Sequence, residues 1–186
     1  IALDAQLRGL QTALVEQHDF ASGTSSRSTK LIHGGLRYLK QFEFKLVNEV
    51  GRERAIVHSI APHLVHPDKM LLPLIKGGNY GYLLTKIGLS VYDFLAGVED
   101  ADRKRMLNKA ETEAVEPLLR KDILEGGGYY AEYRTDDSRL VMAIAKTAAK
   151  KGAILSNYMA FSDFIQSEDG KIASVVVQDQ KTNEKI

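Results

Sequence analysis

The sequence predicts a mixed α/β fold, and two stretches indicate it most directly. Small and apolar residues at helical spacing open the chain and end at Gly9, and the short apolar strand 12–16 follows. Toward the other end, residues 136–152 have the pattern of a helix, with Asp137 as its N-cap and Gly152 as its stop. Strands that alternate with helices are typical of an α/β core.

The bulk composition excludes several classes of protein. The chain of 186 residues has 25 Lys and Arg against 24 Asp and Glu, so its net charge of +1 attracts neither nucleic acid nor an acidic membrane. It has no cysteine, which excludes disulfides and thiolate chemistry and fits a reducing cytosol. The longest apolar stretch, residues 80–97, is interrupted by Lys86 and Asp93. Its helical spacing favours a core-facing helix over a helix that lies in a membrane interface.

The first elements match half of a known supersecondary unit. A helix, Gly9, a buried strand and the acidic Glu16 at its end form the second half of a strand-helix-strand dinucleotide unit. In that unit the acid accepts hydrogen bonds from the adenosine ribose, and a glycine-rich phosphate loop lies about 20 residues earlier. We therefore expect the first strand and a G-x-G-x-x-G turn to precede Ile1, which would make this chain a fragment.

The middle of the chain changes character. All four prolines of the chain occur between residues 52 and 125, three of them (Pro62, Pro67 and Pro73) within twelve residues, and helical and extended pieces alternate irregularly. A helix is expected at 110–116, stopped before Pro117. The sequence then predicts a glycine turn at 126–128 that leads into an aromatic strand. This section has the composition of an insertion between two parts of a nucleotide-binding core.

The predicted domains follow from that change. Residues 1–54 and 126–186 are assigned to the nucleotide-binding core, and residues 55–125 to the inserted segment. Within the core, strands at 161–166 and 172–178 are joined by an Asp-Gly turn, and the charged tail that follows has the pattern of a further turn.

Three histidines of the insertion are candidate metal ligands. They are His58, His63 and His66, with Asp68 nearby. Prolines interrupt the backbone between them, and their spacing fits neither a helix face nor a zincin motif, so no metal site is expected.

The stretch "FASGTSSRSTK" at residues 20–30 begins just past the strand end at Asp19. Loops that approach a pyrophosphate need glycine for close passage, and hydroxyls and backbone amides for the phosphate oxygens. A Ser/Thr-rich turn that merely caps the next helix would have the same composition. Composition alone favours neither reading.

The order of residues resembles a family. The run "DFASGTSSRSTKLIHGGLRYLKQ", with "RGLQTALVEQHDF" before it and "GGGYYAEYRTDDSRLVMAIAKTAAKKGA" after it, is similar to the FAD-dependent glycerol-3-phosphate dehydrogenases in their bacterial aerobic form. The resemblance covers essentially the whole chain. It implies a Rossmann-like FAD core of the glutathione-reductase class with a substrate-side insertion, and it makes these residues the N-terminal part of a longer enzyme.

The same resemblance implies roles for individual residues. Arg37 would bind the substrate phosphate with help from Tyr38, since a guanidinium matches the geometry of a phosphate. His33 would lie at the reactive face of the flavin and act as the catalytic base. The expected FAD-binding residues are Glu16, Thr24, Ser25, Ser26, Thr29, Lys30, Leu31, His33, Gly34, Gly35 and Phe161.

The implied reaction oxidises sn-glycerol 3-phosphate to dihydroxyacetone phosphate and passes the electrons from FAD to a membrane quinone. The implied location is the cytoplasm, with peripheral association at the inner face of the membrane and a homodimer left open. Three alternatives stay open: a glycerol-3-phosphate oxidase that uses oxygen, an NAD-binding Rossmann dehydrogenase for which Glu16 would serve equally well, and a non-catalytic nucleotide-binding or interaction fragment.

Overall fold

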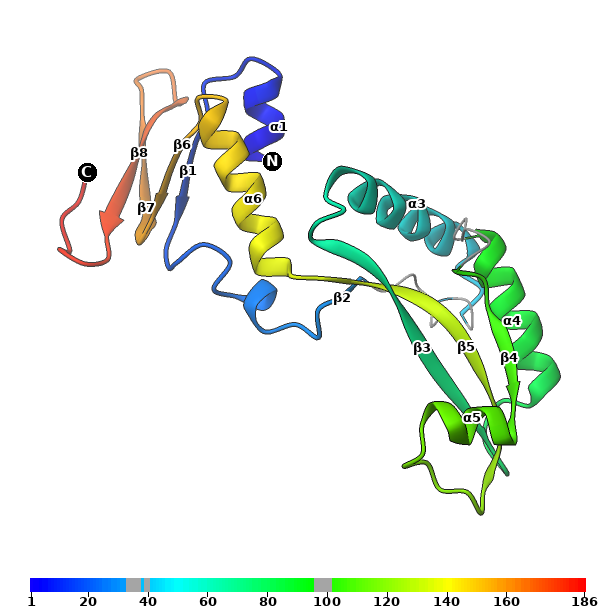
Figure 1. Ribbon diagram of the computed structural model, residues 1–186. Coiled ribbons are helices and arrows are strands. Elements are labelled where there is room, and N and C mark those ends of the chain that lie inside the picture. Colours follow the sequence, from blue (N-terminus) through cyan, green and yellow to red (C-terminus); the bar gives the residue numbers. More distant parts are fainter. Residues whose placement is uncertain (33–37, 39–40, 96–101) are drawn as a thin grey trace. The chain divides into compact units, whose positions relative to one another are not determined.

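The computed structural model describes residues 1–32, 38, 41–95 and 102–186. These residues fall into two units (Figure 1). Unit 1 joins Ile1–Thr29 to Asp136–Ile186, and unit 2 is the continuous segment Lys30–Thr135.

Unit 1 is built on a parallel strand pair. Its helices are α1, η1 and α6, and its strands are β1, β6, β7 and β8, with the bounds α1 Ala2–Leu7, β1 Ala13–Glu16, η1 Thr24–Ser26, α6 Asp137–Lys150, β6 Ile154–Asn157, β7 Met159–Gln166 and β8 Ile172–Asp179. β1 pairs with β6 in parallel, from Ala13 opposite Ile154 to Glu16 opposite Asn157. The amide of Gln6 in α1 donates to the carbonyl oxygen of Lys151 at 3.0 Å, which ties α1 to the end of α6. The predicted helix and strand at the start of the chain are therefore confirmed.

Helix α6 begins one residue away from the expected cap. The side chain of Asp136, not Asp137, accepts from the backbone N–H of Arg139 at 3.1 Å. The prediction of Asp137 as N-cap was wrong because its carboxylate instead accepts a hydrogen bond from the hydroxyl of Ser28. Gly152 has φ +100°, the left-handed geometry expected just past a helix end, so the predicted stop is confirmed.

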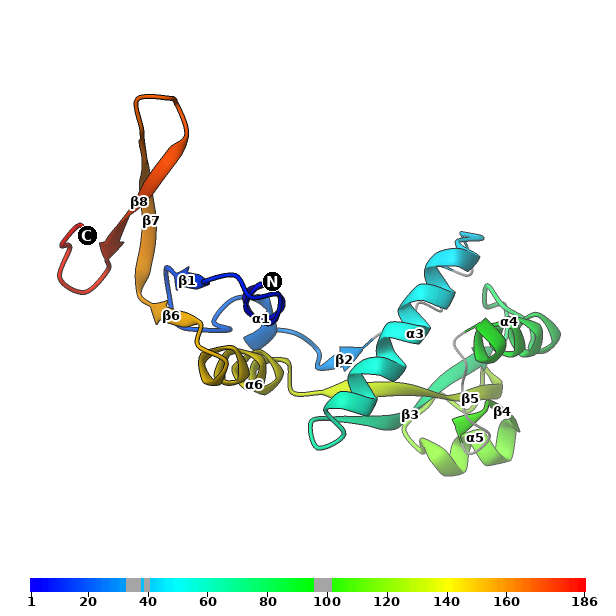
Figure 2. The same ribbon diagram turned by 90° about the horizontal axis from the view of Figure 1, so that it is seen from above.

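The predicted hairpin at the end of the chain is confirmed. β7 and β8 pair antiparallel across a turn in which Gly170 has φ +78°, and they project beyond the β1–β6 pair in Figure 2. The charged tail turns as expected, with Asn183 at φ +62°. Ile186 and Val177 then exchange two backbone hydrogen bonds of 2.9 Å, so the tail returns along β8.

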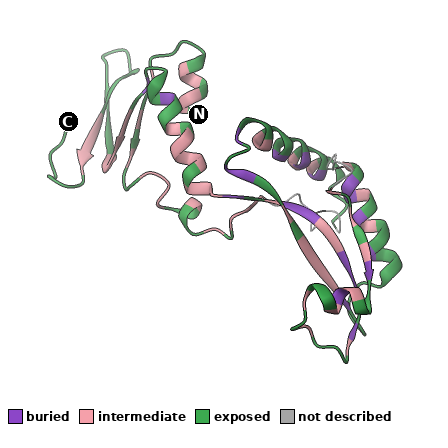
Figure 3. Ribbon diagram, viewed as in Figure 1, coloured by how far each residue is buried: buried purple, intermediate pink, exposed green. Residues whose placement is uncertain are grey.

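Unit 2 is organised around one long strand, β5. The elements are β2 Leu31–Ile32, α3 Phe44–Ile60, β3 Val65–Ile75, α4 Tyr82–Leu95, β4 Arg105–Asn108, α5 Lys109–Val115 and β5 Leu124–Thr135. β5 pairs antiparallel with β3 along almost its whole length, and β2 and β4 also pair with it at different points. Buried positions gather along β3, β5, α3 and α4 (Figure 3).

The three glycines of β5 are interior strand residues, so the predicted glycine turn at 126–128 was wrong. A Cβ on Gly126 would lie 2.7 Å from the carbonyl oxygen of Leu107 in β4. A Cβ on Gly127 would meet α5 at Thr112, whereas one on Gly128 would meet α4 at Leu89, 2.6 Å from its Cδ1. Successive strand residues face opposite sides of a sheet, so α4 and α5 lie close against opposite faces of β5. Glycine is present here for close approach and not for a turn.

Two predicted helices of unit 2 form. α5 ends before Pro117 and begins with a capping box, in which Asn108 and Glu111 satisfy each other's backbone N–H groups. α4 forms as well, but several of its apolar residues do not face the core, since Leu83, Ile87 and Phe94 are 69%, 52% and 84% exposed.

The face of α4 that packs on the sheet contains polar as well as apolar residues. Its buried residues are Thr85, Leu89, Tyr92 and Asp93. Within the described part of the chain, no helix is long and apolar enough to cross a membrane.

The two units and the predicted domains do not share boundaries. The boundary expected at 54/55 lies inside α3, and the boundary expected at 125/126 lies inside β5. β5 belongs to unit 2 because it pairs with β3 from Leu124 to Thr135. The units instead change at Thr29/Lys30 and at Thr135/Asp136.

The close approach at Gly126 gives a test of stability. In the full-length protein, Gly126→Ala should lower stability by about 1–3 kcal/mol, because the new methyl group meets a backbone oxygen that cannot rotate away. Gly88→Ala, in α4 with no atom within 4 Å of the added Cβ, is the matched control. It should be neutral or stabilising by up to about 1 kcal/mol. Thermal unfolding measures both, and equal melting temperatures for the two variants would contradict the packing described here.

Candidate functional site

The carboxyl ends of β1 and β6 form one edge of unit 1. Glu16 is half-buried at this edge, opposite Asn157, and its Oε1 accepts from the backbone N–H of His18 at 2.8 Å. Asn157 donates from Nδ2 to Oδ1 of Asp19 at 2.9 Å. Ligands of open α/β sheets bind beyond the carboxyl ends of the strands. Glu16 therefore lies on the side of the strand pair where a nucleotide would bind.

The loop rich in serine and threonine is fixed on the N-terminal end of α6. The hydroxyls of Ser26 and Ser138 lie 3.0 Å apart, Ser138 Oγ donates to the carbonyl oxygen of Ser25 at 3.0 Å, and Ser28 Oγ donates to Asp137. Three of the loop's serines thus contact a helix that follows about a hundred residues later in the sequence. The loop is structured by tertiary contacts and does not behave as a flexible linker.

Three hydroxyl-bearing residues of the same loop are exposed. They are Thr24 and Ser26 in η1, and Thr29. The first turn of α6 already has two carboxylates, of which Asp136 accepts from the N–H of Arg139 and Asp137 from the hydroxyl of Ser28. The groups of this loop that suit phosphate oxygens are therefore its exposed hydroxyls.

Lys30 and Leu31 belong to unit 2. Lys30 has φ +63°, and its carbonyl oxygen accepts from the N–H of Thr135 at 2.9 Å. Leu31 pairs with Arg134 across β2 and β5. The strand geometry therefore fixes the backbone of both residues.

Four of the predicted site residues, His33, Gly34, Gly35 and Arg37, lie outside the described residues. Tyr38 is described. It is partly buried and packs against the cluster formed by Val47 of α3 and Tyr92 of α4.

Phe161 lies in β7 of unit 1, opposite Val177. Its ring is 51% exposed and lies 4.6 Å from the ring of Phe164, centroid to centroid.

A buried polar network joins the helices of unit 2 to β5. Arg54 of α3 donates from Nη1 to the hydroxyl of Tyr92 at 2.9 Å, and the same Nη1 lies 3.5 Å from Oε2 of Glu132. Arg54, Glu132 and Tyr92 are 3%, 4% and 0% exposed. The guanidinium also lies over the ring of Tyr133, 4.7 Å from its centroid. Burial raises the pKa of Tyr92 above its ordinary value, with the charge of Glu132 as a smaller cause, so its hydroxyl stays protonated well above neutral pH.

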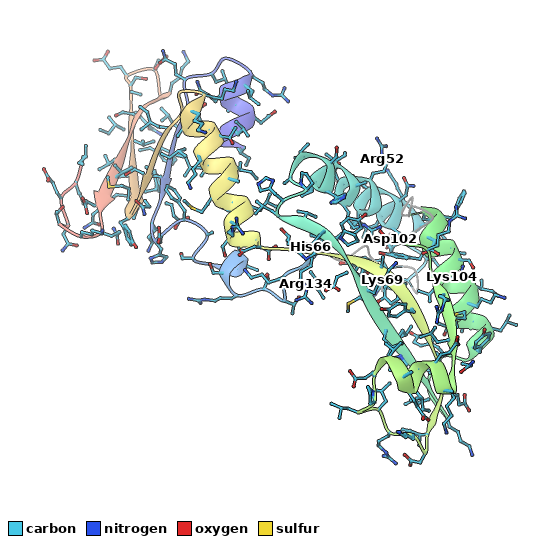
Figure 4. All side chains as sticks on the ribbon, in the orientation of Figure 1. Arg52, His66, Lys69, Asp102, Lys104 and Arg134 are labelled. Atoms are coloured by element: carbon cyan, nitrogen blue, oxygen red, sulfur yellow. The ribbon has the colours of Figure 1, made fainter. Side chains whose placement is uncertain are left out.

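Other charged side chains of unit 2 form ion pairs around its sheet (Figure 4). Lys69 of β3 lies 2.9 Å from Asp102, and Arg134 of β5 lies 2.8 Å from Asp68. Among the described residues there is no group of three His, Cys, Asp or Glu side chains that could hold a metal ion. His58 instead lies 2.8 Å from the carbonyl oxygen of Val65 through Nδ1.

Comparison with known protein families identifies the family to which the chain belongs. The model of the family described as "FAD dependent oxidoreductase" matches residues 1–186. The chain belongs to this FAD dependent oxidoreductase family. The resemblance and the fold class predicted from the sequence are thereby confirmed.

Relatives of this FAD dependent oxidoreductase chain give finer comparisons. It is 56% identical over 184 residues to the aerobic glycerol-3-phosphate dehydrogenase of Staphylococcus aureus, covering 99% of this chain and 33% of that protein. The chain therefore spans about a third of the length of the curated relatives it matches.

Solved structures agree with the family assignment. The glycerol-3-phosphate dehydrogenase of Bacillus halodurans, complexed with FAD, has a TM-score of 0.71 and 44% identity over all of this chain and 29% of its own. The L-alpha-glycerophosphate oxidase of Mycoplasma pneumoniae, with FAD bound, has a TM-score of 0.64 and 16% identity over 98% of this chain and 46% of its own, which shows a shared fold.

The residues of unit 1 fit the cofactor for which the FAD dependent oxidoreductase family is named. A half-buried carboxylate ends a parallel strand, and a structured loop of hydroxyls lies at the N-terminal end of α6. These are the groups that a ribose and a pyrophosphate need.

Sequence reasoning missed the network of Arg54, Glu132 and Tyr92. One signal was available: Val47, Gly51 and Arg54 occupy one buried stripe of α3 at helical spacing. An arginine within a buried stripe requires an acceptor, because its charge is costly to bury alone.

Tyr130 of β5, whose ring lies edge-on to that of Tyr92, gives a pH dependence that can be measured. Burial, followed by the charge of Glu132, raises the pKa of Tyr130 to about 12. The folded pKa is above the unfolded value of about 10, so the stabilisation is complete below pH 10 and is lost as pH rises toward 12. In the full-length protein, Tyr130→Phe should therefore lose less stability than the wild type between about pH 9 and about pH 12. Urea unfolding at both pH values measures this difference, and parallel losses in the two proteins would contradict it.

Proposed function

We propose that the protein to which this chain belongs catalyses the FAD-dependent oxidation of sn-glycerol 3-phosphate to dihydroxyacetone phosphate. The observation that supports this most strongly is the 56% identity to an aerobic glycerol-3-phosphate dehydrogenase along 99% of the chain. The site geometry agrees, since a strand-end acid and a fixed hydroxyl loop suit a dinucleotide.

The cofactor role falls to unit 1 and to the residues that follow it. Glu16 would accept hydrogen bonds from the adenosine ribose, and the backbone of Phe161 would lie against the adenine. Thr24, Ser25, Ser26 and Thr29 would hold the pyrophosphate with hydroxyls and backbone N–H groups. Lys30 and Leu31, whose backbones are fixed in unit 2, would line the flavin together with His33, Gly34 and Gly35. When bound, FAD would supply the acceptor for the hydride that leaves carbon 2 of the substrate.

The substrate role falls to residues 33–38. Arg37 would pair with the phosphate through its planar guanidinium, and the hydroxyl of Tyr38 would add a hydrogen bond. His33 would take the proton from the hydroxyl on carbon 2, since a neutral imidazole is the usual general base near neutral pH. The predicted division into a cofactor part, 1–54 and 126–186, and a substrate-side part, 55–125, belongs to this proposal.

For the electron acceptor, we propose a membrane quinone. A quinone acceptor would require the whole enzyme to approach the inner face of the membrane from the cytoplasm as a peripheral protein, as a monomer or a homodimer. Oxygen is the alternative acceptor, and it would make the protein an oxidase.

The function is tested with the full-length, FAD-loaded protein in single-turnover experiments without oxygen. Glycerol 3-phosphate should bleach the flavin absorbance, and glycerol, which lacks the phosphate, should not. Arg37→Lys should raise the substrate concentration needed for half-maximal reduction, whereas His33→Ala should slow reduction at saturating substrate by about a hundredfold or more. No bleaching by glycerol 3-phosphate would refute the proposed function, and a normal rate in His33→Ala would remove only its role as base.

The acceptor is decided by reoxidation of the reduced protein. Rapid reoxidation by a soluble quinone, with little peroxide formed in air, supports the dehydrogenase. Stoichiometric peroxide in air would instead assign the oxidase reaction.

Glu16 can be tested through cofactor affinity alone. Glu16→Gln keeps the shape of the side chain but leaves only one acceptor oxygen, so the FAD dissociation constant should rise about ten- to a hundredfold. Glu168→Gln, in the exposed hairpin turn, is the matched control and should bind FAD as the wild type does. Fluorescence titration of the apoprotein with FAD measures both constants. If Glu16→Gln binds FAD as tightly as the control, Glu16 is not part of the site.

A further inference from the structure

The guanidinium of Arg54 connects three elements of unit 2 at one point. It comes from α3, donates to the hydroxyl of Tyr92 on α4, and pairs with Glu132 on β5. The ring of Tyr133 lies beneath it. The guanidinium therefore connects α3 and α4 to β5 at one point.

Stability alone is a poor reason for such an arrangement. Burying a guanidinium and a carboxylate costs solvation that their attraction offsets only with good geometry, and apolar residues of equal volume often stabilise as well. A buried polar network does fix one relative placement of its elements, since its hydrogen bonds are satisfied in one geometry and not in neighbouring ones.

Tyr38 depends on it through two contacts. Its side chain packs against the cluster of Val47 and Tyr92, and the hydroxyl of Tyr92 accepts the hydrogen bond of Arg54. Its carbonyl oxygen accepts from the N–H groups of Gln41 at 3.0 Å and Glu43 at 3.1 Å. Glu43 is the N-cap residue of α3, the helix that carries Arg54. The ring and the backbone of Tyr38 therefore both contact elements that Arg54 joins.

We propose that Arg54 is a positioning residue for substrate binding, which acts through Tyr92 and Glu132 to hold α3 and α4 on β5 and so places the hydroxyl of Tyr38 for the substrate phosphate. This inference rests on the proposed function of Tyr38. A hydrogen bond to a phosphate oxygen is lost when its donor shifts by a fraction of an ångström to an ångström, so a residue that touches no substrate can still set its affinity. The raised pKa of Tyr92 agrees, since a protonated hydroxyl beside Glu132 keeps the network in one charge state.

The cleanest variant is Tyr92→Phe in the full-length, FAD-loaded protein. It removes the acceptor of the Arg54 hydrogen bond and leaves the ring that packs against Val47 and Tyr38. The dissociation constant for dihydroxyacetone phosphate, measured by calorimetry, should rise about three- to tenfold, as expected for one displaced hydrogen bond. The Michaelis constant for glycerol 3-phosphate should rise by a similar factor, with the turnover number and FAD content unchanged.

Tyr82→Phe is the matched control. It removes a tyrosine hydroxyl from the same helix at a position that is 51% exposed. It should leave both constants at the wild-type values.

A double-variant cycle shows whether the effect passes through Tyr38. Tyr38→Phe should itself weaken binding of dihydroxyacetone phosphate by about tenfold. In that background Tyr92→Phe should have little further effect, because the hydroxyl whose place it disturbs is already gone. Arg54→Lys, which keeps the charge but loses the planar fork, should behave as Tyr92→Phe does in both backgrounds.

The outcomes separate this inference from the proposed function. If Tyr38→Phe weakens binding and Tyr92→Phe and Arg54→Lys do not, the positioning role is overturned and the substrate role of Tyr38 stands. Equal effects of Tyr92→Phe in both backgrounds also overturn the inference, because the network would then act without Tyr38. An unchanged constant in Tyr38→Phe overturns both this inference and the substrate role of Tyr38, while flavin reduction by glycerol 3-phosphate tests the reaction independently.

Discussion

The packing of unit 2 depends on a stretch of β5 that has no side chains. Gly126 to Gly128 allow β4, α5 and α4 to approach the strand to distances at which any Cβ would collide with an atom of a neighbour. The antiparallel pairing with β3 holds this bare strand in place along its length. Because the helices are close, residues further along β5 reach them too, and Glu132 and Tyr130 can contact the side chains of α3 and α4. The buried polar network is thus a consequence of the close approach.

Much of unit 1 could be predicted from the sequence, because local signals determine it. A glycine after a helix, an apolar run that ends in an acid, and an Asp-Gly turn act within a few residues, and each formed where it was expected. The position of Glu16 at a strand end follows from the same signals. The N-cap of α6 was predicted one residue too late, because either of two adjacent aspartates could cap the helix. Ser28, which is distant in sequence, donates to Asp137 and leaves Asp136 as the cap.

Unit 2 was harder because its determinants are tertiary. Three glycines in a row have the same composition in a turn and in a strand that is approached from both faces, and only the neighbours distinguish the two. α4 has more apolar residues than one face can bury, so its periodicity could not indicate that Leu89 and Tyr92 would lie inward while Phe94 would not. The buried role of Arg54 requires knowledge of Glu132, which lies on a strand that no local pattern connects to α3.

Unit 2 is inserted in the sequence between the two segments of unit 1, and this order affects folding during synthesis. Unit 2 is one uninterrupted segment, whereas β1 of unit 1 has to wait for β6, whose residues are polymerised after all of unit 2. At a translation rate of about 5–20 residues per second, that delay is on the order of ten seconds. Unit 2 has all of its own strands before β6 exists, so we expect it to fold on the ribosome first. The hydroxyl-rich loop would then receive its support from α6 only after all of unit 2 has been synthesised.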